Sequence, residues 1–449
     1  MVTRSQILTG VAAALTCFIV IQCYFYYRVP KLHPIDHARQ QSSAYRMVQE
    51  FIRLCDDSPV HCILVDPWIL KELVEEKWED ARKNFSPCRY FCRNHIYTFA
   101  IRESDFRALN SAVLFKLKKA GYDIRVTSSD QINGNIPTHI NLRYHDNHAI
   151  HLVILHNMTG WWWFGPDSDD EFNLDFTKSE GALAHFDYDF KGHLDGIEMY
   201  MPHYPKRFLD MYEDSFYIPC NKTRAKQFYQ QYPRDESKNA TYIRELSRKA
   251  LKLTQTRLDE FEVPYWIHNA TLLGWLRQCE FISKGTNVEV GVYIKDHHEY
   301  LPEQMKQSLL VLEHKFGRVK DSLQYAYHMA EINLVLNFFY ENRDGKTMWT
   351  GDTDRKTGRK YKYTFNKPKL CWTAMGGVRV RVPCDAEAYI TSSYGKDWFS
   401  PSKNWDWRKS PLNVAPNGQW KESEVSDVIQ LYDIKGKRLL VPEFSKDEL

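Results

Sequence analysis

The sequence predicts an α/β protein in which two domains follow a single membrane anchor, and three observations favour this class. An apolar run extends from Ile7 to Tyr27 near the start of the chain. Mixed helix and strand patterns without internal repeats follow it, and a strand–helix–strand unit between Val263 and Asp296 organises the second half. With 449 residues, 43% of them hydrophobic and 26% charged, the chain is long enough to fold as two globular domains.

The run from Ile7 to Tyr27 is predicted to span a membrane, because a bilayer requires about 20 apolar residues. Its last four residues, Tyr24 to Tyr27, are aromatic, as is typical of a membrane interface. No small-residue cleavage site follows, so we interpret the run as a signal anchor that is retained. Residues 1–6 then form a short tail, and residues 28–44 a polar stem.

The chain ends in Lys446-Asp447-Glu448-Leu449, which is the address for retrieval to the endoplasmic reticulum. The KDEL receptor reads this signal only in the lumen. We therefore expect a type II membrane protein of the endoplasmic reticulum that cycles through the cis-Golgi, with residues 1–6 cytosolic and the body luminal. Acceptor sequons for N-glycosylation agree with a luminal body and stand at Asn84, Asn157, Asn221, Asn239 and Asn269.

Cysteine usage also favours an oxidising compartment. Of the ten cysteines, Cys17 and Cys23 lie in the predicted anchor, which leaves an even number for disulfides in the lumen. We expect at least two disulfides, with Cys371 and Cys384 bracketing a hairpin. A zinc site is the alternative for the first four luminal cysteines, although they contain no Cys-x-x-Cys pair: Cys55, Cys62, Cys88 and Cys92.

Residues 45–225 are predicted to form the smaller α/β domain. Short apolar segments indicate strands at 62–65, 149–155 and 196–201. The run Trp161-Trp162-Trp163 precedes an acidic segment, and it is interpreted either as a sugar-stacking surface or as a packed loop. A polar, turn-rich stretch at 220–238 marks the domain boundary.

The second domain, residues 240–432, begins with an amphipathic helix from Ala240 to Glu260, and residues 433–449 are its tail. A strand from Val263 to Ile267 and a short helix lead to a strand from Asn287 to Ile294. In that strand valines alternate with Asn287 and Glu289, so the two polar side chains share one face. A further strand is predicted from Glu331 to Tyr340.

Two later segments carry charge and aromatic rings. The stretch from Arg355 to Lys362 is a basic hairpin that either neutralises a diphosphate or forms a solvated turn. Trp405 to Arg408 and Asn413 to Trp420 are aromatic and interrupted by proline. The net charge of +3 is too small to indicate nucleic-acid binding.

The second half resembles the LicD family, and within it the fukutin-like members, through an ordered series of short motifs. They are VPYW, LLGWLRQC, HKFGRVKDSL (314–323), FFYE (338–341), KTGRKYKY (356–363), LCWT (370–373), YGKDW and NWDWRKSPLNVAPNGQW (394–420). The first half adds CRYFC (88–92) and HAIHLVILH (148–156).

This resemblance implies a nucleotidyltransferase-like domain with a mixed sheet. It also implies a Mg²⁺-dependent transferase that moves ribitol phosphate from CDP-ribitol to an O-mannosyl glycan on a glycoprotein, with related transferases as partners. The aromatic segment of residues 405–420 would form an active-site wall.

One departure from the family pattern concerns the metal ligands. The family's Asp-x-Asp pair falls on Asn287 and Glu289, and its further Asp falls on Val335. Mg²⁺ prefers charged oxygen ligands, and only one of these three positions is still a carboxylate. Two hypotheses follow. The first is an enzyme that uses Glu289 and Asn287 for the metal, and for the donor phosphates Arg277, Lys284, Lys356, Arg359 and Lys360. The second is a catalytically impaired homologue that acts as a glycan-binding or transferase-partner scaffold in the endoplasmic reticulum.

Overall fold

The computed structural model describes residues 34–75, 89–92, 94–130, 134–144, 148–167, 180–306, 309–402 and 404–440. The predicted anchor, Cys88, Asn84 and the KDEL terminus lie outside these residues. Within them, no helix is both long enough and apolar enough to cross a bilayer. The first described helix, α2 (Pro34–Asp56), starts inside the predicted stem.

The chain divides into two compact units. The N-terminal unit comprises the described residues up to His156, together with Asp167 and Phe186–Leu209. The C-terminal unit comprises Asn157–Pro166, residues 180–185 and the chain from Asp210 onward. The two units therefore exchange segments between His156 and Asp210, whereas the sequence predicts a single linker at residues 220–238.

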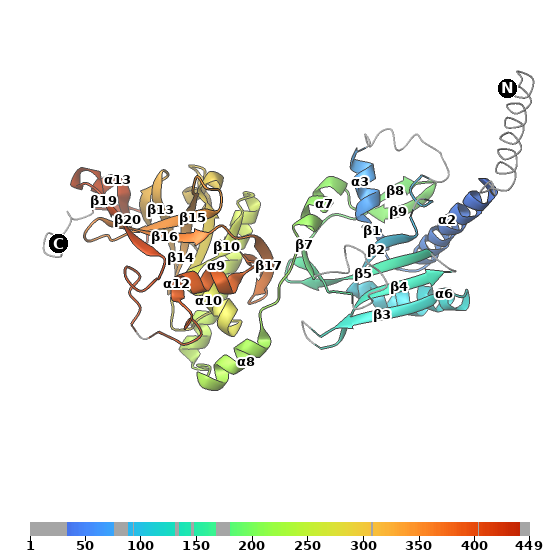
Figure 1. Cartoon of the computed structure of the whole chain (residues 1–449), viewed down its shortest axis with the longest axis horizontal. Coiled ribbons are helices and arrows are strands. Elements are labelled where there is room, and N and C mark those ends of the chain that lie inside the picture. Colours follow the sequence, from blue (N-terminus) through green and yellow to red (C-terminus); the bar gives the residue numbers. More distant parts are fainter. Residues whose placement is uncertain are drawn as a thin grey trace, which may run out of the picture. The chain divides into compact units, whose positions relative to one another are not determined.

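A mixed sheet with the strand order β3-β4-β5-β2-β1-β9-β8 forms the centre of the N-terminal unit (Figure 1). The neighbours β2/β5 and β1/β9 run parallel, and the other neighbours on this path run antiparallel. The strands are β1 (Ile63–Leu64), β2 (Ile96–Arg102), β3 (Asp123–Ser129), β4 (Ile136–Tyr144), β5 (His148–Met158), β8 (Phe190–Leu194) and β9 (Ile197–Met201). The strands predicted at 62–65, 149–155 and 196–201 are confirmed as β1, β5 and β9.

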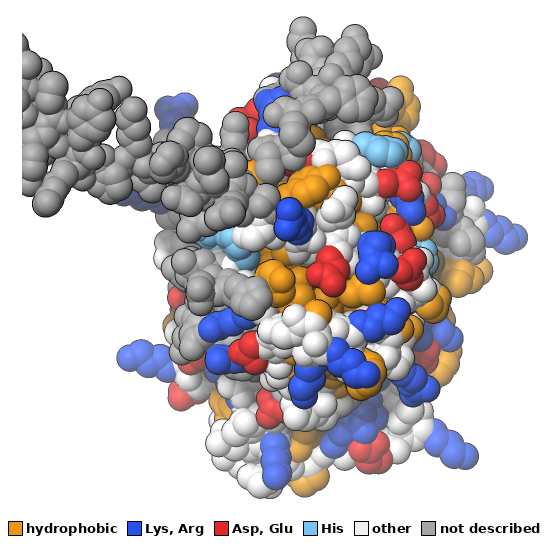
Figure 2. Space-filling model, turned by 90° about the vertical axis from the view of Figure 1, so that its right-hand side faces the viewer, with side chains coloured by type: hydrophobic (Ala, Val, Ile, Leu, Met, Phe, Trp, Pro, Cys, Tyr) orange, Lys and Arg blue, Asp and Glu red, His pale blue; other side chains and the backbone are white. Residues whose placement is uncertain are grey.

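Helical segments of this region contribute further buried apolar side chains. They are α2, α3 (Pro67–Glu75), α5 (Glu103–Ala108), the π-helical turn η1 (Leu109–Leu114), α6 (Phe115–Lys119) and α7 (Pro205–Glu213). Acidic and basic side chains are interspersed over the face of the molecule in Figure 2, in keeping with the small net charge.

The C-terminal unit is built on a second sheet with the order β19-β16-β15-β14-β13-β12-β20-β21, which β11 joins beside β14 and extends to β10. Its strands are β10 (Tyr265–Ile267), β11 (Asn287–Tyr293), β12 (Val311–Arg318), β13 (Asp321–Met329), β14 (Ile332–Glu341), β15 (Thr347–Thr353), β16 (Arg359–Asn366), β19 (Val414–Gln419), β20 (Ile429–Tyr432) and β21 (Arg438–Leu439). The strands β6 (Trp161–Phe164) and β7 (Gly181–Ala184) form one hairpin, and β17 (Leu370–Met375) and β18 (Val378–Pro383) form another. Helices of this unit are α8 (Lys222–Gln231), α9 (Lys238–Glu260), α10 (Asn269–Gln278), α11 (Leu301–Met305), α12 (Ala386–Tyr394) and α13 (Val425–Val428), with the 3₁₀ turns η4 (Ile294–Asp296) and η5 (Glu422–Glu424).

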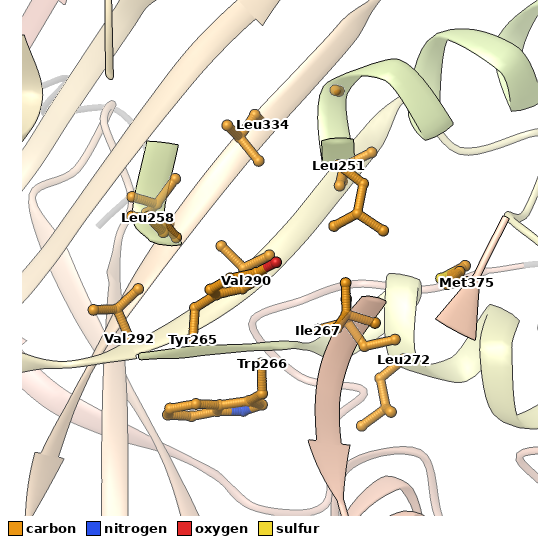
Figure 3. Close-up of a cluster of buried hydrophobic side chains, with 14 of the residues drawn as sticks. Leu251, Leu258, Tyr265, Trp266, Ile267, Leu272, Val290, Val292, Leu334 and Met375 are labelled. Carbon is orange, nitrogen blue, oxygen red and sulfur yellow. The ribbon is translucent and has the colours of Figure 1, made fainter. Parts of the chain in front are cut away.

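The predicted strand–helix–strand unit is confirmed as β10, α10 and β11, and the helix predicted before it as α9. Figure 3 shows its core, where Leu251 and Leu258 of α9 lie near Val290 of β11. Tyr265 and Trp266 point to opposite sides of β10, as neighbours in a strand must. Burial of these apolar side chains is the main force that holds β11 in place.

Three disulfides join described cysteines: Cys55–Cys62, Cys220–Cys279 and Cys371–Cys384. The hairpin predicted between Cys371 and Cys384 is confirmed as β17 and β18, and a disulfide joins its two ends. Because Cys55 and Cys62 are bonded to each other, they do not supply thiolates to zinc, and the four-cysteine alternative is wrong.

The tryptophan run packs in the interior. Trp161 is 2% exposed and Trp163 is 0% exposed. The indole Nε1 of Trp163 donates to Glu180 Oε2 at 3.0 Å. Side chains this enclosed have no face to offer a sugar, so the packing interpretation holds for Trp161 and Trp163.

Candidate active site

The two polar residues predicted on one strand face do lie together, at the edge where β11 meets β14. These strands run parallel, with Asn287 opposite Asn333 and Glu289 opposite Val335. The valines between the polar residues of β11 are fully buried on the other face. The three positions of the family's carboxylates are thus neighbours in space, as the alternation predicts.

A cavity of about 610 Å³ opens over this edge. Strands β11 to β15, the start of α10, the turn before β16 and residues 405–411 contribute to its wall. The polar, charged and aromatic residues lining it include Asn269, Asn287, Glu289, His314, Gln324, Asn333, Asn337, Thr350, Asp352, Asp354, Arg355, Lys356, Trp405, Trp407 and Arg408. The predicted contribution of the aromatic C-terminal segment to this wall is therefore confirmed for Trp405, Trp407 and Arg408.

Local hydrogen bonds orient Glu289. Its backbone N–H donates to Thr271 Oγ1 at 2.8 Å. Asn269, the first residue of α10, adopts a left-handed backbone with φ of 48°, and its Oδ1 accepts from Tyr394 Oη at 2.6 Å. The Asn269 side chain also hydrogen-bonds Glu289. Because Tyr394 occupies the amide oxygen, the amide nitrogen is the group that reaches the carboxylate.

Asn269 is also one of the predicted sequons. Its side chain lines the cavity, and its partner Thr271 is 3% exposed. A glycan here would displace the contacts that hold Glu289. Asn157, Asn221 and Asn239 are exposed and fit the role of acceptor.

A second carboxylate, Asp352 on β15, lies in the same cavity and was missed by the sequence analysis. Burial and the charge of Asp352 raise the pKa of Glu289 to about 7, against the hydrogen bond from Asn269. Burial and the charge of Asp354 raise the pKa of Asp352 to about 6, although hydrogen bonds from Thr353 and Gln324 favour its charged form. The negative charge of Asp352 thus disfavours the charged form of Glu289, and a bound cation would relieve this repulsion.

Thr350 precedes Asp352 by two residues and so lies on the same face of β15. It is 4% exposed, and its Oγ1 has no hydrogen-bond partner among the described residues. A buried hydroxyl without a partner is costly, and a bound ligand or ion would relieve that cost.

Asp354 and Arg408 form an ion pair at the cavity. Arg408 Nη1 lies 3.1 Å from Asp354 Oδ2, and its Nε lies 3.2 Å from Asp406 Oδ1. The other oxygen of Asp354 accepts from the backbone N–H of Lys356 at 2.9 Å. Asp354 therefore shapes the turn, and Arg408 is already partly neutralised. Arg355 and Lys356 are the further cations of this wall.

The five cations predicted to hold phosphate do not gather at one place, because Lys356 alone among them lines the cavity. Arg277 is 5% exposed on α10, with its guanidinium 4.5 Å from the ring centre of Phe228. Lys360 Nζ lies 2.5 Å from Asp321 Oδ2. Lys284 is exposed in the turn before β11, and Arg359 begins β16. The roles predicted for these four residues stay predictions.

The signal that could have revealed Asp352 is the short sequence Asp352-Thr353-Asp354. It is an Asp-x-Asp pattern placed directly before the basic hairpin.

The C-terminal unit combines a mixed sheet with a polar cavity, and comparison with known proteins gives its class. A family model for the LicD/FKTN/FKRP nucleotidyltransferase domain matches residues 262–385, and one for the fukutin N-terminal region matches residues 1–248. The chain belongs to the fukutin family.

Two curated relatives illustrate the match. The chain is 33% identical to mouse ribitol-5-phosphate transferase FKTN over 463 residues, which cover 96% of this chain and 99% of the relative. It is 35% identical to the human protein of the same name over 415 residues, covering 87% and 89%. Among solved structures, the lincosamide antibiotic adenylyltransferase LnuA aligns at 13% identity over 32% of this chain and 85% of its own, with a TM-score of 0.23, which is too low to support a shared fold.

Proposed function

We propose that the protein is a ribitol-phosphate transferase of protein glycosylation, which moves ribitol phosphate from CDP-ribitol to an O-mannosyl glycan on a glycoprotein. The names and coverage of the fukutin relatives support the reaction class. The observation that carries the proposal is the cavity in which Asp352 joins Glu289. It supplies a second carboxylate where the family positions retain one.

The residues present fit a divalent cation, although in a different set from the family's. Asn287 contributes one neutral oxygen, and Val335 contributes no ligand atom. Glu289 and Asp352 contribute two carboxylates, and the Thr350 hydroxyl lies on the same strand face as Asp352. These oxygens are the hard ligands that Mg²⁺ prefers. When bound, the ion would neutralise charge on the transferred phosphoryl group.

In the proposed reaction, an acceptor hydroxyl forms a bond to the phosphorus that bears ribitol. The bond from that phosphorus to CMP breaks, CMP leaves with the electron pair, and the hydroxyl proton passes to water. Because such transition states are loose, positioning and charge neutralisation dominate. Arg355 and Lys356 supply positive charge at the cavity, and Trp405, 38% exposed and stacked on Tyr394 at 4.5 Å between ring centres, offers a ring face to the nucleobase.

The test is CMP release from CDP-ribitol by the full-length protein in detergent, with an O-mannosyl glycan as acceptor. Wild type should release CMP only with Mg²⁺ or Mn²⁺ and acceptor present. Glu289→Gln and Asp352→Asn should each lose turnover, and Lys226→Ala, which removes an exposed charge of α8 outside the cavity, is the matched control.

A catalytically impaired scaffold is the second candidate, and the replacements at Asn287 and Val335 favour it. It predicts glycan binding without CMP release in the wild-type protein. That result would overturn the transferase proposal.

We further propose that the protein resides in the endoplasmic reticulum membrane as a type II protein, retrieved by the KDEL receptor. The sequence at Ile7–Tyr27 and at the carboxy terminus supports this. Deleting Lys446 to Leu449 should give glycans that resist endoglycosidase H. Resistant glycans on the intact protein would contradict retrieval.

A further inference from the structure

A cluster of two histidines and an aspartate lies inside the N-terminal unit, apart from the cavity described above. His139 on β4 and His151 on β5 are diagonal neighbours, since Asn141 is opposite His151 in the register. Both histidines are 0% exposed. Their rings are nearly parallel, at 10°, with His139 Nδ1 2.9 Å from His151 Nε2.

Asp167 brings a carboxylate to the two imidazoles. One ligand atom from each of His139, His151 and Asp167 lies within 4.8 Å of the other two. In the part of the chain that the structure describes, this is the one group of three or more metal-binding side chains with such spacing. Asp167 is half-buried, so the cluster is closed on the histidine side and nearer to solvent at the carboxylate.

Neighbouring side chains hold the other atoms of these groups. Thr98 Oγ1 lies 3.4 Å from His151 Nδ1, the ring nitrogen that faces away from His139. Asn141 Nδ2 donates to Asp167 Oδ2 at 3.0 Å. Metal-binding histidines and carboxylates are commonly fixed by such outer partners, which set the ring nitrogen that faces the ion.

The chemistry of the cluster suits zinc. A neutral imidazole has one nitrogen with a lone pair to give to a metal, and the Thr98 hydroxyl, 3.4 Å from His151 Nδ1, can accept the proton of that nitrogen and so leave Nε2 for the ion. Zn²⁺ takes imidazole nitrogens and carboxylate oxygens at about 2.0–2.2 Å in a tetrahedron. Ligands at that distance are a little over 3 Å apart, by the geometry of a tetrahedron. The distance between the two nitrogens would need to increase only slightly to admit the ion.

We propose that His139, His151 and Asp167 bind one Zn²⁺ ion, with a water as the fourth ligand. The site is independent of the transferase proposal, because none of its residues lines the cavity at Glu289. The competing explanation is a hydrogen bond between two neutral imidazoles, with no ion.

The experiment measures metal content by mass spectrometry in the full-length protein, purified without chelators and without a histidine tag. Wild type should contain about one zinc per chain, as should His148→Gln, the control on the same strand β5. His151→Gln and Asp167→Asn should lose most of it. Glu289→Gln with Asp352→Asn should keep the zinc, so failure of the transferase proposal and failure of this one are distinguishable.

A milder variant covers the case in which ligand substitutions prevent folding. Asn141→Ala keeps all three ligands and removes the partner of Asp167, and it should bind zinc about 10- to 100-fold more weakly in a competition with a chelating dye. Wild-type protein without zinc after equilibration with the ion would overturn the proposal. Iron or manganese in its place would overturn the assignment to zinc.

Discussion

The two polar clusters of this molecule use the same backbone device and differ in their chemistry. His139 and His151 are diagonal neighbours on one face of β4 and β5, and Asn287 and Glu289 share one face of β11. The N-terminal cluster presents two buried imidazoles and one carboxylate, and the C-terminal cavity presents Glu289 and Asp352 with hydroxyl and amide groups. Nitrogen ligands suit zinc, and oxygen ligands suit magnesium.

The two clusters also differ in how exposed they are to solvent. The histidines are 0% exposed, whereas the carboxylates line a cavity of about 610 Å³. A closed site holds an ion and little else, and an open one has room for a substrate beside the ion. The position of a side chain on a strand therefore sets which groups meet, and the type of ligand atom and the access from solvent distinguish the two proposed sites.

The largest expected effect tests the cavity that contains Glu289 and Asp352. Glu289→Gln combined with Asp352→Asn should lower CMP release at least a hundredfold, because each removed charged contact is worth about 1.5–3 kcal/mol. Steady-state assays of CMP release at saturating CDP-ribitol provide the measurement. The control Lys226→Ala should leave the rate unchanged. A double variant that retains most of its activity would show that the carboxylate pair is not the cation site.

The second prediction concerns substitutions that restore the family's carboxylates in this cavity. Asp at positions 287, 289 and 335 together should restore three carboxylates around one point. A gained charged ligand should tighten Mg²⁺ or Mn²⁺ binding roughly 10- to 100-fold. Calorimetry on the wild-type and triply substituted proteins, with nucleotide present, decides the outcome. No gain would mean that the ligand set of Glu289 and Asp352 has replaced the older one, or that its geometry is lost.

A third prediction concerns pH. The pKa of Glu289, raised from 4.5 to about 7, means that without a cation its contribution to stability is complete below pH 4.5 and is lost as the pH rises through 7. Thermal unfolding in magnesium-free buffer should therefore show stability falling between pH 5 and 8, and added Mg²⁺ should reverse the fall. Chelators are omitted so that a zinc site keeps its ion.

The smallest effect follows from the same carboxylate. Glu289→Gln removes the cost of a buried charge, so the variant should be more stable than wild type at pH 7 without Mg²⁺, by about 1–3 kcal/mol. Denaturant unfolding curves measure this difference. If Glu289→Gln were instead less stable, the raised pKa of Glu289 would not describe the folded protein.

Local pattern was enough to predict much of this fold. Alternation along residues 287–294 predicted which face of β11 carries Glu289, and it predicted Val335 as a neighbour. Asp352 was missed because β15 reaches the cavity only through its pairing with β14, a contact that no local pattern contains. Arg277 was assigned to phosphate because helical spacing cannot show that Phe228, nearly fifty residues earlier, covers its guanidinium.

The histidine cluster shows the same limit. His151 lies on the strand predicted at 149–155, whereas the sequence analysis predicted no strand at β4, which carries His139. Asp167 comes from beyond a further strand, and its approach depends on how the chain returns after β6. Sequence separation alone gives no reason to group these three residues.

The Cys220–Cys279 disulfide has a practical consequence for producing this protein. It joins the residue before Asn221, the N-cap of α8, to the C-cap of α10, the helix whose first residue holds Glu289 in place. Expression in a reducing cytosol, or a purification buffer with thiols, would leave α10 without that tether. If protein from such a preparation were inactive, the missing disulfide would explain the result, and the assay would not test the catalytic site. The protein should therefore be produced in a host with an oxidising secretory route.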